Sequence, residues 1–538
     1  MALKQSVYPA EGEVIEEFKV DEPPAPKGSV TAVLPSINRF GIVFIMLYLP
    51  LAFGGVHRIS FLVASLVLIV LLMLNFYAQP KLWNQLTGYS RDSFYSWSAL
   101  LCLSLLFLYV TAQGAFLIFT EKSHSVLGLA RLFPDAENYF SFVRSVLFAL
   151  CAFMFTLIYL RESARNFRRV IRVAVISGLI VSLVGISHWF YDNGKLFWLF
   201  EPDYIFTSTR ARWPFVNSNH LGHFLLPLFF LTLSEALTAF TEIAPASVML
   251  FSGDRKIINT ALRNKKLQSA LMQFLVYSLI LISIAVCIAA TLSRSSWFGL
   301  GIGLVLFVLL SGRKEKKNVQ PFRMKRKPSG RQKRVRRSRS IYDSLPGRLM
   351  LLGRLVKPLL LVLGVSFILF FLYGRGIELI SDRLEYGLMY SKTDMRWQLY
   401  RDTLPMLKGA LLFGVGAGAW QALYPLYMDT SLSGINPVYL HSDPLQLLTE
   451  LGVAGTLPLA ALVLIVSLAA IKALRVKSAK TEYKNTLLCL LCGQIGLLAA
   501  SFFDFPFRMP AIVFYTAVCL SLTLFCIDRI NLSGQEIG

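Results

Sequence analysis

Three polar segments between apolar stretches carry residues that could act on a phosphate or a sugar. They are residues 210–220, residues 292–296, and the stretch from Arg396 to Gly452. An arginine guanidinium stays charged and can bind two phosphate oxygens at once. The candidates among their arginines are Arg210, Arg212, Arg294 and Arg396. Together they predict electrostatic stabilisation of a departing diphosphate, which is often the largest catalytic contribution.

Each arginine also has a simpler interpretation. Arg294 lies between two apolar runs and could reach lipid headgroups with its long side chain. Either arginine of the first segment could be solvated. Arg396 could pair with Asp394 or Asp402 on a loop helix. The diphosphate hypothesis therefore requires that arginines from separate segments converge on one pocket.

His441 is the best candidate for a general base, because imidazole titrates near neutral pH. Asp443, Pro444 and Gln446 match the N-cap, first and third positions of a helix, which predicts a helix starting directly after the histidine. Its N–H groups would offer positive potential to an anion and keep the imidazole neutral. Ser442 invites a Ser-His-Asp interpretation, but adjacent side chains do not face each other on a helix. Asp443 is better explained as a cap.

Several amides and one acid are candidates for substrate contacts. Asn217, Asn219 and His220 close an outer loop and could bond glycan hydroxyls, or Asn219 could cap the following helix. Gln446 and Glu450 follow the candidate base and could also face the substrate. Glu450 could instead orient a catalytic group or pair with an arginine.

Neither a nucleotide site nor a metal site is indicated. Gly414, Gly416 and Gly418 are spaced as in a nucleotide fingerprint, but no strand precedes them, so a tight turn is the better interpretation. The carboxylates show no D-x-D spacing, the histidines are scattered, and all seven cysteines lie in apolar runs. We expect no metal, no cofactor and no disulfide framework.

The elements that position these residues must cross a membrane. Of the 538 residues, 55% are hydrophobic and 16% are charged, which excludes a disordered chain. Apolar runs approach the ~20 residues that span a bilayer, which argues against an ordinary soluble enzyme. We predict an all-α integral membrane protein with twelve transmembrane helices. They are expected at residues 39–54, 58–77, 94–113, 141–160, 169–190, 220–240, 268–290, 296–311, 358–374, 446–471, 485–503 and 509–527.

Charge sets the expected orientation, because cytoplasmic loops concentrate Lys and Arg. Basic connections at 161–172, 255–266 and 472–484 predict that both termini are cytoplasmic. The expected parts are a disordered tail (1–38), eight spans (39–311), a basic cytoplasmic loop (312–357), a ninth span (358–374), a large periplasmic loop (375–443), three spans (444–527) and a cytoplasmic tail (528–538). All the candidate residues then lie on or near the outward side.

The basic loop contains 17 Lys and Arg against two acidic residues and supplies most of the net charge of +23. Its only aromatic residues are Phe322 and Tyr342, and it lies beside the bilayer. Anionic lipid headgroups are therefore the expected partner, at ~1 kcal/mol per nearby basic residue. Nucleic acid is a weaker alternative that rests only on charge, and no nucleic-acid partner is predicted.

The ordered motifs resemble those of the O-antigen ligase and O-antigen polymerase superfamily. The matching elements are N-x-N-H at 217–220, S-R-S at 293–295, R-W at 396–397, G-V-G-x-G at 414–418 and H-S-x-x-L-Q-x-x-x-E-x-G at 441–452. The resemblance spans roughly residues 40–527, and the basic loop departs from it. It implies glycan transfer from undecaprenyl diphosphate to a saccharide acceptor at the outer face of the bacterial inner membrane.

The expected reaction is an inverting, metal-independent transfer. The acceptor could be lipid A core (a ligase) or another lipid-linked glycan (a polymerase), and the resemblance of the 503–506 segment slightly favours a polymerase of an exported polysaccharide. The alternative is a transporter or flippase of a lipid-linked saccharide. Transporters tend to have repeated halves and midplane sites, whereas this sequence shows no internal repeat and its polar candidates lie on one side.

Overall fold

The computed structural model is all-helical over the residues it describes. These are 30–79, 94–121, 136–199 apart from 192, 194 and 196, 210–250, 264–311, 394–429 and 436–535, together with 378, 381–383 and 385. Within these ranges, eleven helices are long and apolar enough to cross a membrane. The expected fold class is confirmed. The expected span at 358–374, the loop at 312–357 and the first 29 residues lie outside the described residues.

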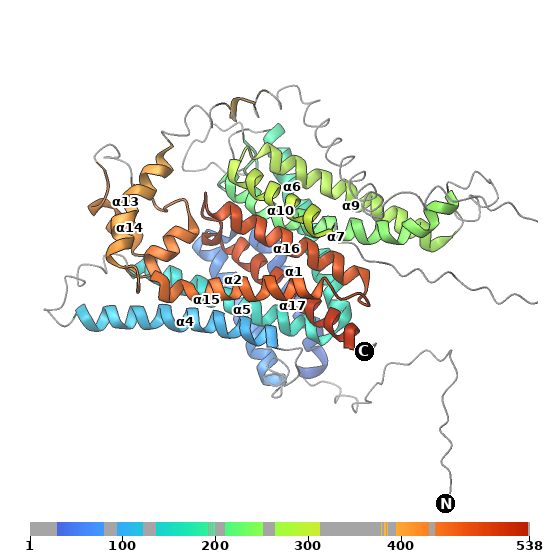
Figure 1. Ribbon diagram of the computed structural model, residues 1–538, viewed down its shortest axis with the longest axis horizontal. Helices are drawn as coiled ribbons and strands as arrows, with labels where there is room; N and C mark the ends of the chain where they lie inside the picture. The colour runs from blue at the N-terminus through green and yellow to red at the C-terminus, as the bar shows by residue number, and fades with distance from the viewer. Residues whose placement is uncertain are drawn as a thin grey trace, which may run out of the picture.

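The eleven long helices match the expected spans in order (Figure 1). They are α1 (Val30–Leu51), α2 (Arg58–Ala78), α4 (Phe94–Glu121), α5 (Ala136–Glu162), α6 (Ala164–Phe190), α7 (Ser218–Leu250), α9 (Lys265–Ala290), α10 (Arg294–Ser311), α15 (Asp443–Ala473), α16 (Thr481–Ser501) and α17 (Pro510–Gln535). One difference is at α1, which begins nine residues earlier than expected, inside the segment interpreted as tail. Asn38 explains the difference, because it is fully buried and exchanges amide hydrogen bonds with Asn75 of α2.

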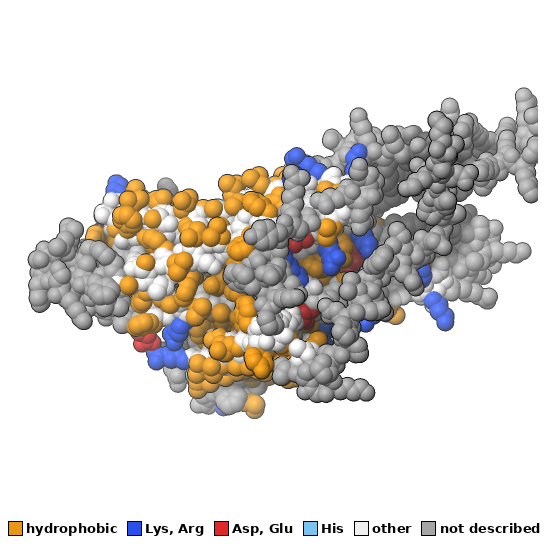
Figure 2. Space-filling view, turned by 90° about the horizontal axis from the view of Figure 1, so that it is seen from below, with side chains coloured by type: hydrophobic (Ala, Val, Ile, Leu, Met, Phe, Trp, Pro, Cys, Tyr) orange, Lys and Arg blue, Asp and Glu red, His pale blue; other side chains and the backbone are white. Residues whose placement is uncertain are grey.

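Small residues let the central helices approach closely. A Cβ added to Gly299 of α10 would lie 2.5 Å from the carbonyl oxygen of Gly496 in α16, and the converse distance is also 2.5 Å. Such contacts are typical of helices that associate within a bilayer. Large apolar side chains such as Leu62, Leu105 and Leu464 point outward instead. Figure 2 shows hydrophobic side chains over most of the described surface, with charged groups mainly toward its two ends.

The two ends of the bundle differ in their polar chemistry. At one end, Arg168 of α6 donates to both oxygens of Glu482 in α16, and Arg161 of α5 pairs with Asp528 of α17 at 3.5 Å. The starts of α7, α10 and α15 meet at the other end. There, α13 (Met395–Gly409), α14 (Trp420–Leu423) and the 3-10 turn η5 (Tyr424–Leu426) form a separate small unit, at the left of Figure 1.

The small outer unit has its own core. Leu399 and Met406 of α13 pack with Trp420 and Tyr424, and all four side chains are buried. Asp402 accepts a hydrogen bond from the Tyr424 hydroxyl at 2.9 Å, which fixes α13 against the following turn. This packing gives α13 a rigid base next to the start of α15.

Helix α15 is broken at Gly452, and the segment 411–416 pairs with the break. Gly452 has φ 65° and ψ −174°, which interrupts the helical hydrogen bonds. The N–H of Val415 donates to the carbonyl of Thr449 at 2.9 Å, and the N–H of Val453 donates to the carbonyl of Leu411 at 2.9 Å. These exchanges satisfy backbone groups that the break leaves unpaired. Gln113 of α4 adds donors to the Phe413 and Glu450 carbonyls at 2.9 and 3.1 Å.

The glycines of the G-V-G-x-G motif permit this close backbone pairing. Gly414, Gly416 and Gly418 have φ values of 74°, 119° and 74°. A Cβ on Gly414 would lie 2.3 Å from the carbonyl oxygen of Glu450. The expected tight turn is therefore confirmed, and its role is to dock a loop against the broken helix.

Candidate active site

His441 immediately precedes α15, as the sequence predicts, but the helix cap is displaced by one residue. Ser442 occupies the N-cap and makes no side-chain cap bond, while Asp443 is the first helical residue. The prediction that Asp443 caps α15 is wrong, because its carboxylate instead accepts the N–H of Phe507 at 2.8 Å. The N–H of Asp443 donates to the carbonyl of Asp504 at 3.1 Å. This helix terminus is thus directed at the chain's own 504–508 segment.

The backbone of His441 is held in an unusual conformation. Its φ is +59°, in the left-handed region that non-glycine residues rarely adopt. The hydroxyl of Tyr400 in α13 donates to the His441 carbonyl at 2.8 Å. The N–H of the preceding residue, Leu440, donates to the side chain of Gln446 at 3.1 Å. Surrounding elements therefore stabilise a conformation that is unfavourable by itself, as is common at functional sites.

The imidazole of His441 faces a buried carboxylate. Its Nδ1 lies 3.6 Å from Oδ1 of Asp504, and Asp504 is fully buried whereas the histidine side chain is 26% exposed. The Nδ1 atom itself is buried. The ring edge opposite Asp504 is therefore available to a substrate. A carboxylate in this position can orient an imidazole and stabilise its protonated form.

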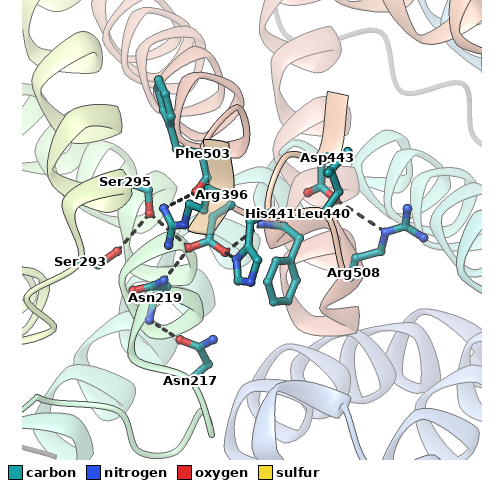
Figure 3. A network of polar contacts seen from close by, with 12 residues as sticks. Asn217, Asn219, Ser293, Ser295, Arg396, Leu440, His441, Asp443, Phe503 and Arg508 are labelled. Carbon is teal, nitrogen blue, oxygen red and sulfur yellow. Dashed lines mark hydrogen bonds and ion pairs between the residues drawn. The ribbon is translucent and has the colours of Figure 1, made fainter. Parts of the chain in front are cut away.

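Asp504 also binds one residue from each of two other site segments (Figure 3). Its Oδ2 accepts the side-chain amide of Asn219 at 2.6 Å and the hydroxyl of Ser295 at 3.4 Å. Burial alone would raise the pKa of Asp504, but the neighbouring His441, His223 and Arg396 hold that pKa well below its usual range. The carboxylate is thus ionised at neutral pH.

Three of the predicted arginines come close together. Burial, followed by repulsion from the Arg383 guanidinium, lowers the pKa of Arg210 to about 10. Arg396 and Arg294 add smaller repulsive contributions, and Asp504 opposes them. Hydrogen bonds support this proximity, because Asp394 contacts both Arg294 and the N–H of Arg396, while Arg210 bonds Asn219, a partner of Asp504. Segments far apart in the sequence therefore converge at this point. Arg210 remains a cation at neutral pH.

The contacts of these arginines differ from the simpler interpretations. Arg396 Nη1 donates to the Phe503 carbonyl at 2.7 Å. Asp394 caps α13 through the N–H of Arg396, but its other oxygen pairs with Arg294 at 3.0 Å. Asp402 accepts from Gln398 and Tyr424. The guanidinium of Arg396 is thus directed at the Phe503 carbonyl.

Arg212 is placed differently from Arg210. It is 5% exposed, and its guanidinium lies 5.1 Å from the ring centre of Trp213. Arg210 instead donates to the carbonyl of Thr291 at 2.7 Å and to the side chain of Asn219. Since Asn219 also bonds Asp504, Arg210 is the member of the pair that joins the site network.

The helix cap of α7 is Asn217, whereas Asn219 was the candidate for that position from the sequence. Asn217 caps α7, since its side-chain oxygen accepts the N–H of Asn219 at 2.8 Å. The prediction of Asn219 as the cap is wrong, because its side chain is bonded to Arg210 and Asp504. His220 is 5% exposed and packs edge-on against the ring of Phe505 at 4.9 Å.

Gln446 and Glu450 are buried at 2% and 0% exposure. The amide of Gln446 donates to Glu450 at 2.9 Å, and Glu450 accepts from Arg508 at 3.0 Å. The expectation that Glu450 could pair with an arginine is therefore confirmed. That Gln446 and Glu450 contact the substrate stays a prediction. Both side chains already bond to groups within the protein, which does not favour it.

Sequence reasoning missed three residues near the site, Asp504, Arg383 and Arg508. Asp504 and Arg508 both lie in a five-residue outer connection, 504–508. An acid and an arginine in so short a connection were the available signal for these two residues. Their partners are more than 50 residues away in the sequence, so no local spacing connects them. Within the described residues, no group of three or more His, Cys, Asp or Glu side chains could hold a metal ion.

Comparison with known proteins adds the family. Residues 279–460 match the family model described as O-Antigen ligase. The chain is thus a membrane protein that carries an O-antigen ligase domain over residues 279–460. The matched region includes Arg294, Arg396 and His441, whereas Arg210, Asn219 and Asp504 lie outside it. A search of the curated proteins finds no match. Membership of the O-antigen ligase family implies a glycosyltransferase that acts on lipid-linked glycans.

Proposed function

We propose that the protein is an inverting, metal-independent glycosyltransferase. It transfers a glycan from undecaprenyl diphosphate to a saccharide hydroxyl at the periplasmic face of the bacterial inner membrane, as an O-antigen polymerase or ligase. The observation that carries this proposal is the pairing of His441 with the buried Asp504 carboxylate at 3.6 Å, next to converging arginines. A base beside a cationic pocket suits attack on a carbon that bears a diphosphate.

His441 removes the proton from the acceptor hydroxyl with its exposed ring edge. The acceptor oxygen then forms a bond to the anomeric carbon from the side opposite the diphosphate. The bond between that carbon and the phosphate oxygen breaks, and its electron pair leaves with undecaprenyl diphosphate. Asp504 stabilises the resulting imidazolium, because its carboxylate is already ionised and in place. Configuration at the anomeric carbon is inverted.

The departing diphosphate is stabilised by Arg210, Arg294 and Arg396. The contacts that join their segments, through Asp394, Asn219 and Asp504, support a shared anion among these groups. Arg210 is preferred to Arg212 as the diphosphate ligand, because the guanidinium of Arg212 lies over Trp213. Preorganised positive charges of this kind act without reorganising during the reaction.

The test uses purified protein, a polyprenyl-diphosphate-linked glycan and a saccharide acceptor, with no energy source. His441→Ala is expected to lower product formation by about 10²–10⁴-fold, the usual contribution of a general base. His57→Ala is the matched control, because His57 is exposed, precedes α2 and makes none of the site contacts described above. Unchanged product formation by His441→Ala refutes the proposed base. Lipid A core and lipid-linked repeat units, supplied separately, distinguish a ligase from a polymerase.

A further inference from the structure

Arg508 is a buried cation that the proposed reaction does not use. It ends the 3-10 turn η7 (Pro506–Arg508), and its side chain is 14% exposed. Its Nη2 donates to Oε2 of Glu450 at 3.0 Å, and its Nε lies 3.7 Å from Oδ1 of Asp443. Burial alone would lower the pKa of Arg508, but the two carboxylates raise it. One guanidinium therefore joins η7 to two points on α15.

Two aromatic rings fix the orientation of this guanidinium. Its Cζ lies 5.2 Å from the ring centre of Phe142 in α5 and 5.8 Å from that of Tyr439. Cations at these distances are attracted by the ring faces. The Tyr439 ring in turn packs against Phe505 at 4.5 Å, and Phe505 contacts the His441 ring at 4.8 Å. Arg508 is thus anchored between elements that surround the candidate base.

A chain of hydrogen bonds leads from Arg508 to the backbone beside His441. Oε1 of Glu450 accepts the amide of Gln446 at 2.9 Å, and the amide oxygen of Gln446 accepts the N–H of Leu440 at 3.1 Å. That N–H belongs to the residue before His441, whose φ of +59° needs external support. The hydrogen bonds through Glu450 and Gln446 supply this support from the interior of the protein.

A second route connects Arg508 to Asp504. Asp443, which the guanidinium approaches, accepts the N–H of Phe507 and donates its own N–H to the Asp504 carbonyl. The segment 440–443 carries the histidine, and the segment 504–508 carries its carboxylate partner. The two segments are therefore joined to the guanidinium through Glu450 and through Asp443, and Figure 3 shows the contact between Arg508 and Asp443.

We propose that Arg508 is a positioning residue for the His441–Asp504 pair. By bridging Glu450 and Asp443, it fixes the two segments that carry these groups and so sets their 3.6 Å separation. Arg508 acts on the reaction through these residues and does not contact the substrate. The inference rests on the proposed function, since it concerns the geometry of the base in that reaction.

The deciding variant is Arg508→Lys, assayed in the full-length purified protein. Lysine keeps the positive charge but lacks the fork that reaches two carboxylates at once. Because misplacement of a catalytic group by about 1 Å can cost 10²-fold, kcat is expected to fall about 10–100-fold. The KM for the lipid-linked donor should change by less than about 3-fold, because ground-state binding is left intact. The thermal unfolding midpoint should stay close to that of the wild type.

Arg168→Lys is the matched control. Arg168 also makes two hydrogen bonds to one carboxylate, Glu482, at 2.7 and 2.6 Å, but at the opposite end of the bundle. It loses the same fork geometry without touching the site. Its kcat and KM should equal those of the wild type.

A folded Arg508→Lys protein with wild-type kcat overturns the inference, as does a loss that appears only in KM. If Arg508→Lys does not fold, the double variant Glu450→Gln with Arg508→Gln decides, because it removes both charges of the 3.0 Å pair together. A folded double variant with wild-type kcat also overturns the inference. If instead His441→Ala retains full activity, the proposed function itself fails. An inactive His441→Ala with a fully active Arg508→Lys rejects only the positioning role.

Discussion

At the residue scale, the site depends on a histidine whose carboxylate partner lies on a different helix connection. Asp504 gathers His441, Asn219 and Ser295 around one buried charge. The arrangement is chemically consistent, because the ionised carboxylate can hold the imidazole in one tautomer and stabilise it after proton transfer. It assigns distinct duties to two groups, with proton transfer at His441 and orientation at Asp504.

Replacing Asp504 with asparagine tests this division of duties. Asparagine has nearly the same shape but cannot stabilise an imidazolium, so kcat is expected to fall by about 10²–10⁴-fold. Asp528→Asn serves as the control, because Asp528 pairs with Arg161 at the other end of the bundle. Steady-state kinetics of glycan transfer give both values. A fully active Asp504→Asn protein contradicts the proposed role of the carboxylate.

The ionisation of Asp504 also predicts a pH dependence of stability. Its pKa in the folded protein is well below the usual range, so folding favours the ionised form. The resulting stabilisation is present above the unfolded value of about 3.9 and is lost as the pH falls toward the folded pKa. The difference in thermal midpoint between wild type and Asp504→Asn should be largest above about pH 5 and narrow below about pH 4. A difference independent of pH contradicts the assignment.

At the element scale, the broken helix α15 and the segment 411–416 form one unit. The chain can pair there only because Gly414 and Gly452 lack side chains and adopt positive φ. The pairing fixes the start of α15, which carries the catalytic segment. The glycine motif is thus structural, and its effect on catalysis is indirect.

Gly414→Ala should destabilise the protein strongly. The added Cβ would meet the Glu450 carbonyl oxygen at 2.3 Å, and φ is 74°. The conformational cost alone is about 1–3 kcal/mol, so the free energy of unfolding should fall by about 2 kcal/mol or more. Gly301→Ala in α10 is the control, because nothing lies within 4 Å of its added Cβ. Alanine there should be neutral or stabilising by up to about 1 kcal/mol. Denaturation in detergent measures both, and equal stabilities would contradict this account.

The helices were predictable from the sequence, whereas the contacts between the site residues were only partly predictable. Long apolar runs determine the spans, because a bilayer leaves few alternatives to a helix. His441 and the arginines were recognisable from residue type and motif. Asp504 and Arg508 were not, since their significance arises from contacts between distant segments. The cap at Asn219 was misassigned for the same reason, because its tertiary partner Asp504 outweighs local capping.

At the scale of the whole molecule, the polar groups separate to opposite ends of an apolar bundle. The candidate site occupies one end, and the Arg168–Glu482 pair lies at the other. The charge pattern of the connections predicts that the site end faces the periplasm. All seven cysteines lie in helices, and six of them are buried, which allows introduced thiols to report on orientation.

Introduced cysteines should distinguish the two ends. Val438→Cys, at a position 50% exposed beside the site, should react in intact cells with a thiol reagent that crosses only the outer membrane. Lys480→Cys, in the connection between α15 and α16, should react only after lysis. The unmodified protein measures the background. The reverse labelling pattern would place the site in the cytoplasm and contradict the proposed location.

The interruption at Gly452 has a mechanical consequence. Residues 453–473 form the part of α15 after the break, whereas residues 443–451 lie before it and directly follow His441. Membranes of different thickness change the tilt of a spanning helix. Here the run of helical hydrogen bonds stops at Gly452, so we expect less of such tilting to reach the segment that carries the imidazole. We therefore expect catalysis to be insensitive to acyl-chain length over a range in which an unbroken helix would transmit the strain.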